Sequence, residues 1–465
     1  MGKKSILRAV AIGALTLPAT VLQAQDAGEA GEGGVVTTLG IEQRFGAGRN
    51  LALETPAEGR TLASDTTLSF GVTTVTPLDR LSVGGSVAFR LADEPGGSIS
   101  EFERPRLSFV YGREGANAAF DLSGSYRRDR VDFLRDLTAF IGDDGTLDLP
   151  DDFDDLEGEG TRGDYALDAA LELGTSAPLG VTLEAGVSGT DYEDTSDPDL
   201  VDIDRYRLGA SARLTFSPVT EGRIGISRAV SEEDDAGRTR ITDDEIEIGL
   251  LQEISPRSRF EAALGYAMFE TEEFGATEDE DGLTARFDYE WDMPDGQLDA
   301  LFEVSRTEDG ARTELSFGRL RDLPLGALTA RIGLSKAEFG DPELIGRLDW
   351  RRDLPDGVLT ASLDRSVTTT DPDSAATTTS LVVGWSREIN AVSGIAFDLN
   401  YAAVSETGEN DIARAGLTAS YSRDLTADWA MTLGLAWRME DEDTLDRVTS
   451  EEVYLSLSRD FSWRR

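Results

Sequence analysis

The sequence predicts an all-β protein, a transmembrane antiparallel up-and-down β-barrel of about 22 strands, and three features support this fold. Apolar and polar residues alternate in segment after segment. These segments are roughly 9 to 13 residues long, close to the 9 to 11 of a tilted membrane strand and well above the 5 or 6 of soluble strands. The connections between them are alternately short and long. Two weak segments, 35–46 and 344–352, leave a range of about 18 to 22 strands.

The alternation is clearest between residues 283 and 291. Leu283, Ala285, Phe287, Tyr289 and Trp291 occupy one phase, and Thr284, Arg286, Asp288 and Glu290 occupy the other. Successive side chains of a strand point to opposite faces of the sheet, so each such segment has one apolar and one polar face. The predicted strand cores are 35–46, 64–74, 80–90, 104–113, 117–128, 163–174, 179–190, 204–216, 221–230, 240–251, 258–269, 281–291, 296–306, 311–321, 326–337, 344–352, 356–366, 377–388, 392–404, 411–422, 427–438 and 450–461.

The two phases are expected to face different solvents. A charged side chain on the lipid face costs a few kcal/mol near the bilayer midplane, so the polar phase is predicted to line a wet lumen. Phe89, Phe287, Trp350 and Trp437 are predicted to face lipid, and Ser86 and Thr432 to face the lumen. The charged residues predicted to face the lumen include Arg207, Arg213, Arg286, Asp288, Glu290, Arg331, Arg347, Asp349 and Arg351. In a soluble β-sandwich the apolar face would instead form a core, but a sandwich does not need so many long segments.

The connections form two groups. The short ones carry turn residues, as in Met293-Pro294-Asp295-Gly296, Leu323-Pro324-Leu325-Gly326 and Leu354-Pro355-Asp356-Gly357. The clearest longer, acidic ones are 47–63, 129–162, 191–203, 231–239, 270–280 and 439–449. Short turns at one rim and longer loops at the other are typical of outer-membrane barrels, whose short turns are periplasmic. An even number of strands then places both chain ends at the short-turn rim.

A short motif recurs where descending strands end. It appears as Arg321-Asp322-Leu323-Pro324, Arg352-Asp353-Leu354-Pro355, Arg423-Asp424-Leu425 and Arg459-Asp460-Phe461. The repeated unit is a hairpin, which favours a single barrel over several globular domains.

The first 25 residues are typical of a secretory signal peptide. Lys3, Lys4 and Arg8 precede an apolar run that ends near Leu22, and acidic sequence begins at Asp26. The run is too short to span a bilayer as a helix, which needs about 20 residues. We therefore expect a cleaved signal peptide at 1–25, a short segment at 26–34 and one barrel domain at 35–465. An uncleaved N-terminal anchor is the alternative.

Composition excludes several functions. The chain has 465 residues with no Cys and no His, which removes disulfides, thiolate sites and the commonest general base and transition-metal ligand. Its 89 acids and 44 bases give a net charge of −45, and a surface of this kind repels nucleic acid. Catalysis by Ser and His is impossible without His, so we expect no enzyme.

The C-terminal strand carries a family resemblance. Val453, Leu455, Leu457, Phe461 and Trp463 share one phase. This pattern resembles the closing strand of outer-membrane proteins, which implies recognition by the barrel assembly machinery. The chain as a whole resembles porin-like outer-membrane β-barrel proteins of Gram-negative bacteria. Its strand number is also similar to that of the TonB-dependent transporters, but only about ten residues separate the cleavage region from the first strand. We therefore expect no plug domain and no energised uptake of that kind.

The long connection 129–162 is the candidate constriction of the lumen. Its acids include Asp151, Asp152, Asp154, Asp155 and Glu157. Such carboxylates suit weak Ca²⁺ or Mg²⁺ binding, and no other cofactor is expected. The loop either folds into the pore or stays solvated outside it, and the sequence leaves both open.

The predicted function is an outer-membrane channel for passive or substrate-selective diffusion of small hydrophilic solutes, with a preference for cations because the outer loops are acidic. Two alternatives remain: an export conduit, for instance for an exopolysaccharide, and a structural or adhesive surface barrel. The expected surroundings are outer-membrane lipid and lipopolysaccharide. A homo-oligomer is compatible with the sequence.

Overall fold

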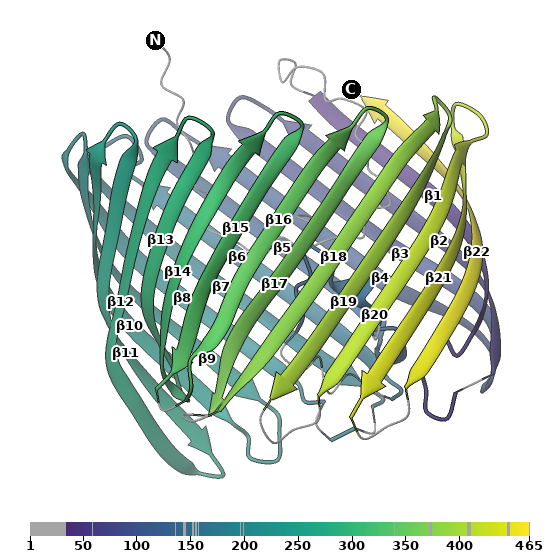
Figure 1. The fold of residues 1–465 in the computed structure, drawn as a ribbon, viewed down its shortest axis with the longest axis horizontal. Helices are drawn as coiled ribbons and strands as arrows, with labels where there is room; N and C mark the ends of the chain where they lie inside the picture. Colours follow the sequence, from purple (N-terminus) through teal and green to yellow (C-terminus); the bar gives the residue numbers. More distant parts are fainter. Residues whose placement is uncertain are drawn as a thin grey trace.

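The computed structural model is one closed antiparallel sheet of 22 strands (Figure 1). It describes residues 34–464, except for 58, 135, 143–145, 151, 152, 154, 155, 157, 196, 199, 339, 372, 373, 407–410 and 444–446. The predicted signal peptide at 1–25 and nearly all of the segment 26–34 lie outside the described residues. Within the described chain, no helix has both the length and the apolar character to span a membrane.

Each predicted segment corresponds to one strand, so the prediction of an all-β barrel with 22 strands is confirmed. The observed strands are 12 to 18 residues long and extend past most of the predicted cores. Their bounds are β1 Gly34–Arg49, β2 Arg60–Val75, β3 Asp79–Glu94, β4 Gly97–Glu114, β5 Ala118–Arg130, β6 Thr161–Leu173, β7 Leu179–Glu193, β8 Ile203–Ser217, β9 Thr220–Glu233, β10 Arg240–Ser255, β11 Ser258–Glu273, β12 Ala276–Met293, β13 Gly296–Thr307, β14 Gly310–Leu323, β15 Gly326–Ala337, β16 Glu343–Leu354, β17 Gly357–Asp371, β18 Ser374–Asn390, β19 Ser393–Glu406, β20 Ile412–Asp424, β21 Trp429–Glu442 and β22 Val448–Arg464.

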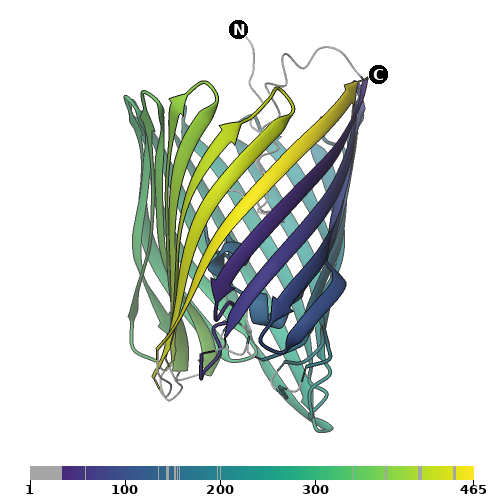
Figure 2. The same cartoon turned by 90° about the vertical axis from the view of Figure 1, so that its right-hand side faces the viewer.

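The sheet closes between its first and last strands. β1 pairs antiparallel with β22 from Val36 opposite Arg464 to Arg49 opposite Glu451. Figure 2 shows the two strands side by side, β1 in purple and β22 in yellow. β1 therefore begins and β22 ends at the same rim, which is the rim of the short turns.

The short turns depend on glycine at one position. Gly296 and Gly326 each follow a Pro-containing turn and have φ values of 131° and 139°. A Cβ at either position would collide with a backbone oxygen of the neighbouring strand. These turns therefore need glycine both for the positive φ and for the close approach of the strands.

One predicted loop proved to be strand. Residues 270–280 were expected to form a long acidic connection, but β11 and β12 stay paired up to Glu273 opposite Ala276, and only Phe274 and Gly275 separate them. This hairpin projects beyond the rest of the barrel (Figure 1). Both of its faces are wet there, so both carry polar residues and the alternation that would reveal a strand is lost.

The register assigns every strand a lumen face and a lipid face. Arg438 contacts Asp136, which belongs to a segment inside the barrel, so Arg438 faces the lumen. Paired residues share a face, and tracing the pairs around the sheet returns to β21 in the same phase. The outward residues include Phe89, Phe287, Trp350 and Trp437, and the lumen residues include Ser86, Arg286, Asp349 and Thr432.

The outward face is apolar where it is most exposed. Leu283 of β12 is 71% exposed, and Ile332 of β15 is 61% exposed. A row of exposed large apolar side chains around a closed sheet is the arrangement that lipid requires, because the interior of the barrel cannot cover them.

We predict that Ile332→Arg, near the middle of β15, lowers the free energy of unfolding by about 2 to 4 kcal/mol, because it places a charge on the lipid face. The control is Thr329→Arg in the same strand, which faces the lumen opposite Asp349 and should change stability little. Chemical unfolding in lipid vesicles measures both. An equal loss in the two variants would contradict the assignment of faces.

Candidate functional site: a lumen narrowed by an internal segment

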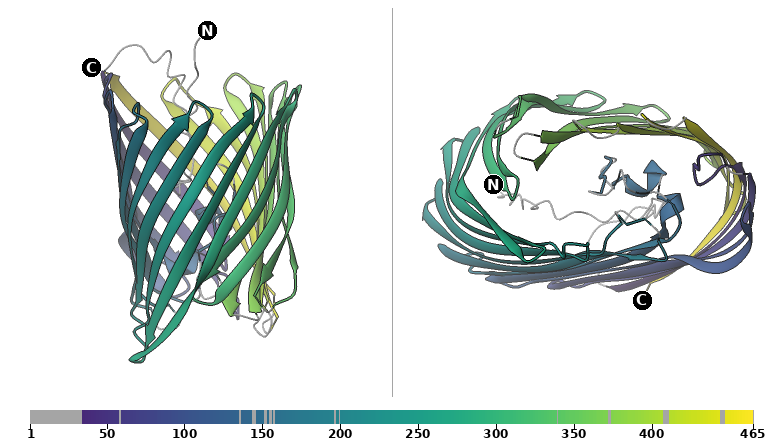
Figure 3. Two further views of the ribbon diagram at one scale, coloured as in Figure 1. Left: turned by 90° about the vertical axis from the view of Figure 1, so that its left-hand side faces the viewer. Right: turned by 90° about the horizontal axis from the view of Figure 1, so that it is seen from below.

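The connection between β5 and β6 folds into the barrel. We call its described residues between 131 and 160 the lumen segment. The backbone N–H of Val131 donates to the Gly160 carbonyl at 3.0 Å and closes its base. Two 3₁₀ turns follow, η1 Val131–Phe133 and η2 Leu137–Phe140. Seen along the barrel, they lie inside the ring of strands, in blue (right-hand view of Figure 3).

A small apolar core holds the lumen segment together and packs it on the wall. Ala402 of β19 and Ile412 of β20 contribute from the wall, and Leu200 contributes from the β7–β8 connection. The buried members from the segment are Val131, Leu134, Leu137, Phe140, Phe153 and Leu156. Apolar burial of this kind is the main stabilising contribution to a docked loop, so the segment is a folded insert rather than a solvated loop.

Arg414 of β20 anchors the far end of the segment. Its Nε lies 2.7 Å from the Glu440 carboxylate, and its Nη1 donates to the Phe153 carbonyl at 2.9 Å. Its guanidinium carbon also lies 4.4 Å from the centroid of the Phe153 ring. The Arg414 side chain is 1% exposed and that of Glu440 is 6% exposed. This charge pair is excluded from water because the segment covers it.

A second anchor joins η2 to β21. The Arg438 Nε lies 2.6 Å from Asp136 Oδ2, and its Nη2 lies 3.1 Å from Glu452. Asp136 also accepts a hydrogen bond from the backbone N–H of Thr138 and so caps η2. One carboxylate thus fixes both the local fold of the segment and its position on the wall.

The base of the segment carries a charged network. Arg130, at the end of β5, lies 2.6 Å from Asp132 and 3.5 Å from Glu94. The guanidinium carbons of Arg90 and Arg130 lie 4.8 Å and 4.9 Å from the centroid of the Phe133 ring. Cation–π contacts of this type contribute roughly 0.5 to 2 kcal/mol when they are shielded from water.

Asp132 and Asp136 of the lumen segment have opposite pKa shifts. Burial raises the pKa of Asp136, but the attraction of Arg438 and the hydrogen bonds from Thr138 outweigh it, so the net pKa is lowered. Burial also raises the pKa of Asp132, and the attraction of Arg130 does not offset it, so that pKa stays raised. The charged form of Asp136 therefore favours docking, whereas the charged form of Asp132 opposes it.

A second element narrows the lumen from another side. β16 pairs with β17 only from Arg365 to Gly357, and the rest of β17 continues with β18 alone. Arg312 of β14 donates to the Val367 carbonyl, which places this end of the β17–β18 hairpin against the lumen face of β14. Ser316 and Ser335, on the lumen face of β14 and β15, are 0% and 2% exposed. The hairpin covers them.

The remaining wall carries cross-strand ion pairs. All nine charged residues predicted for the lumen lie on its face. Their pairs are Arg207 with Asp168, Arg213 with Glu221, Arg286 with Glu303 and Asp288, Arg259 with Glu290, Arg331 with Asp299, Arg347 with Asp349 and Arg351 with Asp353. Each of these nine charges has an opposite charge beside it, so these pairs themselves contribute little to the long-range field of the wall.

The acids proposed for the constriction cannot be placed. Asp151, Asp152, Asp154, Asp155 and Glu157 lie outside the described residues. Their described neighbours belong to the buried core of the lumen segment. Within the described part of the chain, no group of three or more acids is arranged to hold a metal ion. The expected weak divalent site therefore stays a prediction.

The anchoring arginines were not among the residues predicted from the sequence. Arg414 and Arg438 occupy the inward phase of their strands, and that phase alone does not distinguish an arginine that meets a docked segment from one that faces water. The sequence around Asp136 gives a weak indication of the turn, since an Asp two residues before a Thr is typical of a capped turn.

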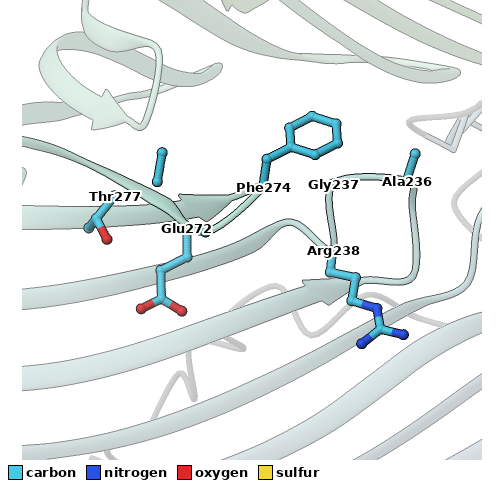
Figure 4. A pocket seen from close by; sticks show the side chains of 8 residues that line it. Ala236, Gly237, Arg238, Glu272, Phe274 and Thr277 are labelled. Carbon is cyan, nitrogen blue, oxygen red and sulfur yellow. The ribbon is translucent and has the colours of Figure 1, made fainter.

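A shallow hollow of about 430 Å³ lies at the long-loop rim, away from the segment. It joins the β9–β10 and β11–β12 connections, because the Phe274 N–H donates to the Gly237 carbonyl at 3.0 Å. Figure 4 shows the Phe274 ring projecting to the side opposite the Glu272 carboxylate and the Arg238 guanidinium. Phe274 is 74% exposed.

Sequence comparison matches no family model and no curated protein. Solved structures do match. The FrpB iron transporter of Neisseria meningitidis has a TM-score of 0.55 at 11% identity, over 92% of this chain and 82% of that one. A mutant of the ferric enterobactin receptor PfeA of Pseudomonas aeruginosa has a TM-score of 0.53 at 8% identity, over 92% of this chain and 80% of that one. The siderophore receptor PirA of Acinetobacter baumannii has a TM-score of 0.54 at 8% identity, over 93% of this chain and 81% of that one. These similarities show that the chain shares the β-barrel fold of these proteins.

The comparison overturns the predicted function. A channel for passive or substrate-selective diffusion was expected, without energised uptake of the kind found in TonB-dependent transporters. The barrels that share this fold are instead an iron transporter and siderophore receptors. The lumen segment and the β17–β18 hairpin occupy part of the lumen, so the connection 129–162 adopts the inward one of the two arrangements that the sequence left open. The prediction of a cation-preferring porin was therefore wrong.

We predict opposite effects for two substitutions in the lumen segment. Asp136→Asn removes the charge that binds Arg438 and should loosen the segment, whereas Asp132→Asn removes a charge whose burial is unfavourable and should leave docking unchanged or tighter. Hydrogen exchange of peptides from 131–160 at pH 7 measures this. In the wild type, the stabilisation of docking by the Asp136 charge should be lost only as the pH falls below the usual pKa of Asp. Faster exchange in Asp132→Asn than in Asp136→Asn would contradict the prediction.

A second prediction concerns the buried anchor. Glu440→Leu leaves the Arg414 charge buried without its carboxylate and should destabilise the barrel by about 3 to 5 kcal/mol. The double variant Arg414→Met with Glu440→Leu removes both charges and should recover most of that loss. Unfolding midpoints of the two variants and the wild type form the test. A double variant no more stable than the single one would show that the pair is not isolated from water.

Proposed function

We propose that this barrel is an outer-membrane receptor for uptake of a specific ligand, and that the ligand is an iron complex. The observation that carries the proposal is a folded lumen segment, docked by a buried ion pair, inside a 22-stranded barrel of the type found in iron and siderophore receptors. A pore for general diffusion needs no such anchored insert. The insert gives the lumen a defined shape, which suits recognition of one ligand.

The wall favours recognition by contact. Its arginines that were predicted to face the lumen each lie beside a carboxylate, so their attraction for a distant anion is weak. Several guanidinium groups remain accessible to a ligand in the lumen, including those of Arg207 and Arg351, which are 62% and 61% exposed. A paired guanidinium still has free N–H donors for a polar ligand oxygen.

The charged residues of the long connections indicate which ligand charge the barrel favours. Outside the lumen segment, Arg238 and Arg447 are the basic residues among the described residues of these connections. The acids there are Glu54, Asp194, Asp197, Asp202, Asp234, Asp235, Glu308, Asp309, Glu338, Asp341, Asp411 and Asp443. A mouth of this charge repels anions, so we propose a cationic or neutral complex.

Equilibrium binding to the protein in lipid nanodiscs tests the proposal. We expect saturable quenching of tryptophan fluorescence by cationic ferrioxamine B or neutral ferrichrome, and weaker binding of anionic ferric enterobactin. The metal-free chelators serve as the control for quenching that does not depend on the bound iron. The variant Asp136→Asn, with its loosened lumen segment, should bind the complexes more weakly. The absence of saturable binding by all three complexes, together with sugar flux through proteoliposomes that rises linearly with concentration, would refute the receptor function.

A further inference from the structure

The arginines of the recurring motif at the ends of descending strands form an outward row together with Arg387, which is followed by Glu388. The row consists of Arg321, Arg352, Arg387, Arg423 and Arg459, on the alternate strands β14, β16, β18, β20 and β22. Each pairs across the sheet with an outward apolar residue, namely Leu328, Leu359, Ile395, Met431 and Trp429 in the same order. The acid that follows Arg in the motif has the opposite phase and faces the lumen. The motif therefore separates its two charges between lipid and lumen.

The row lies at the level of the membrane interface. It is close to the short-turn rim, where these strands end. Two residues deeper on the same outward face lie Trp350, Trp385 and Tyr421. Trp and Tyr concentrate at the boundary between lipid and water, so the arginines one step nearer the rim lie at the level of the headgroups.

The guanidinium groups are available for a ligand. Arg321 and Arg387 are 58% and 57% exposed, and their turn carboxylates, Asp295 and Asp356, lie at 3.4 Å and 3.7 Å. Exposed pairs of this length are weak and hold only part of a group that has five N–H donors. Arg459 is also supported by rings, since its guanidinium carbon lies 4.4 Å from the centroid of Phe461 and 5.7 Å from that of Trp429.

The charge of the row contrasts with the rest of the chain. Acids outnumber bases by 89 to 44 over the whole sequence, and the outward face of β10–β12 at the opposite rim carries Asp244, Glu270, Asp279 and Asp281. Five outward arginines on consecutive alternate strands at a single rim give a positive arc on an acidic protein. Strands lie about 4.8 Å apart, so alternate strands place the arginines roughly 10 Å apart across the sheet. This spacing leaves room for a phosphate beside each guanidinium.

We propose that the arginine row binds the phosphate groups of anionic phospholipids in the periplasmic leaflet, the leaflet that meets the short-turn rim. Guanidinium and phosphate form paired, charge-assisted hydrogen bonds, which an ammonium group cannot match in geometry. The row fixes the height of the barrel in the membrane on this side. It also selects anionic lipids for the arc from β14 to β22, which faces the viewer in Figure 1.

Native mass spectrometry of the detergent-solubilised full chain, titrated with phosphatidylglycerol or with phosphatidylcholine of the same acyl chains, tests the proposal. The wild type should retain phosphatidylglycerol preferentially. In the triple variant Arg352→Gln, Arg387→Gln and Arg423→Gln, this preference should fall by on the order of fivefold for each arginine removed. The matched control, Arg331→Gln, Arg347→Gln and Arg351→Gln, removes the same charge from the lumen face and should keep the preference.

Three results would overturn the proposal. These are equal retention of the two lipids by the wild type, an unchanged preference in the row variant, and complete displacement of the lipid by an equal concentration of inorganic phosphate, which would indicate a site for free anions. Heat-modifiable migration on gels checks that each variant is folded. If the triple variant does not fold, the lipid preference of Arg423→Gln alone is compared with that of the wild type.

Discussion

Closure of the sheet in lipid is the constraint on which the rest of this structure depends. The bilayer core offers no water to an unpaired backbone N–H or C=O, so each strand edge must be hydrogen-bonded to another strand. The pairing of β1 with β22 meets this requirement for the two strands that would otherwise be edges. An all-antiparallel sheet closes in this way only with an even number of strands. The shared rim for both ends of the sheet follows from that number.

Closure also determines where charge is tolerated. The outward phase meets lipid along most of each strand, so charge collects in the lumen and at the two rims. In the open part of the lumen, water and cross-strand partners stabilise the charged side chains, as for Arg286 beside Glu303. Under the lumen segment the water is excluded, and Arg414 depends on Glu440 and the Phe153 carbonyl instead. The same residue type therefore forms weak, exposed pairs on one part of the wall and a buried anchor on another.

The function was mispredicted because the strand pattern alone does not distinguish a diffusion channel from a receptor barrel. The strand count suggested a wide channel, and the sequence left open whether the connection 129–162 folds into it. The connection 129–162 was recognised as a constriction candidate, but only through its acids. Its apolar residues, such as Leu137 and Phe153, decide its position, because they form a core with Ala402 and Ile412. Residues this far apart in sequence show no periodicity that links them, so the contact could not be predicted.

The sequence by itself determined the strands, their number, the two rims and the face on which each side chain lies. These properties are local, since a period of two and a turn motif can be read within about ten residues, and the membrane enforces them along every strand. The tertiary structure decided where chain segments meet inside the barrel. It docked the lumen segment on β19–β21, folded the β17–β18 hairpin against β14, and aligned Arg387 with the arginines of four distant Arg-Asp motifs in one row at the rim. Such contacts depend on the curvature and register of the closed sheet, which no single segment of the chain contains.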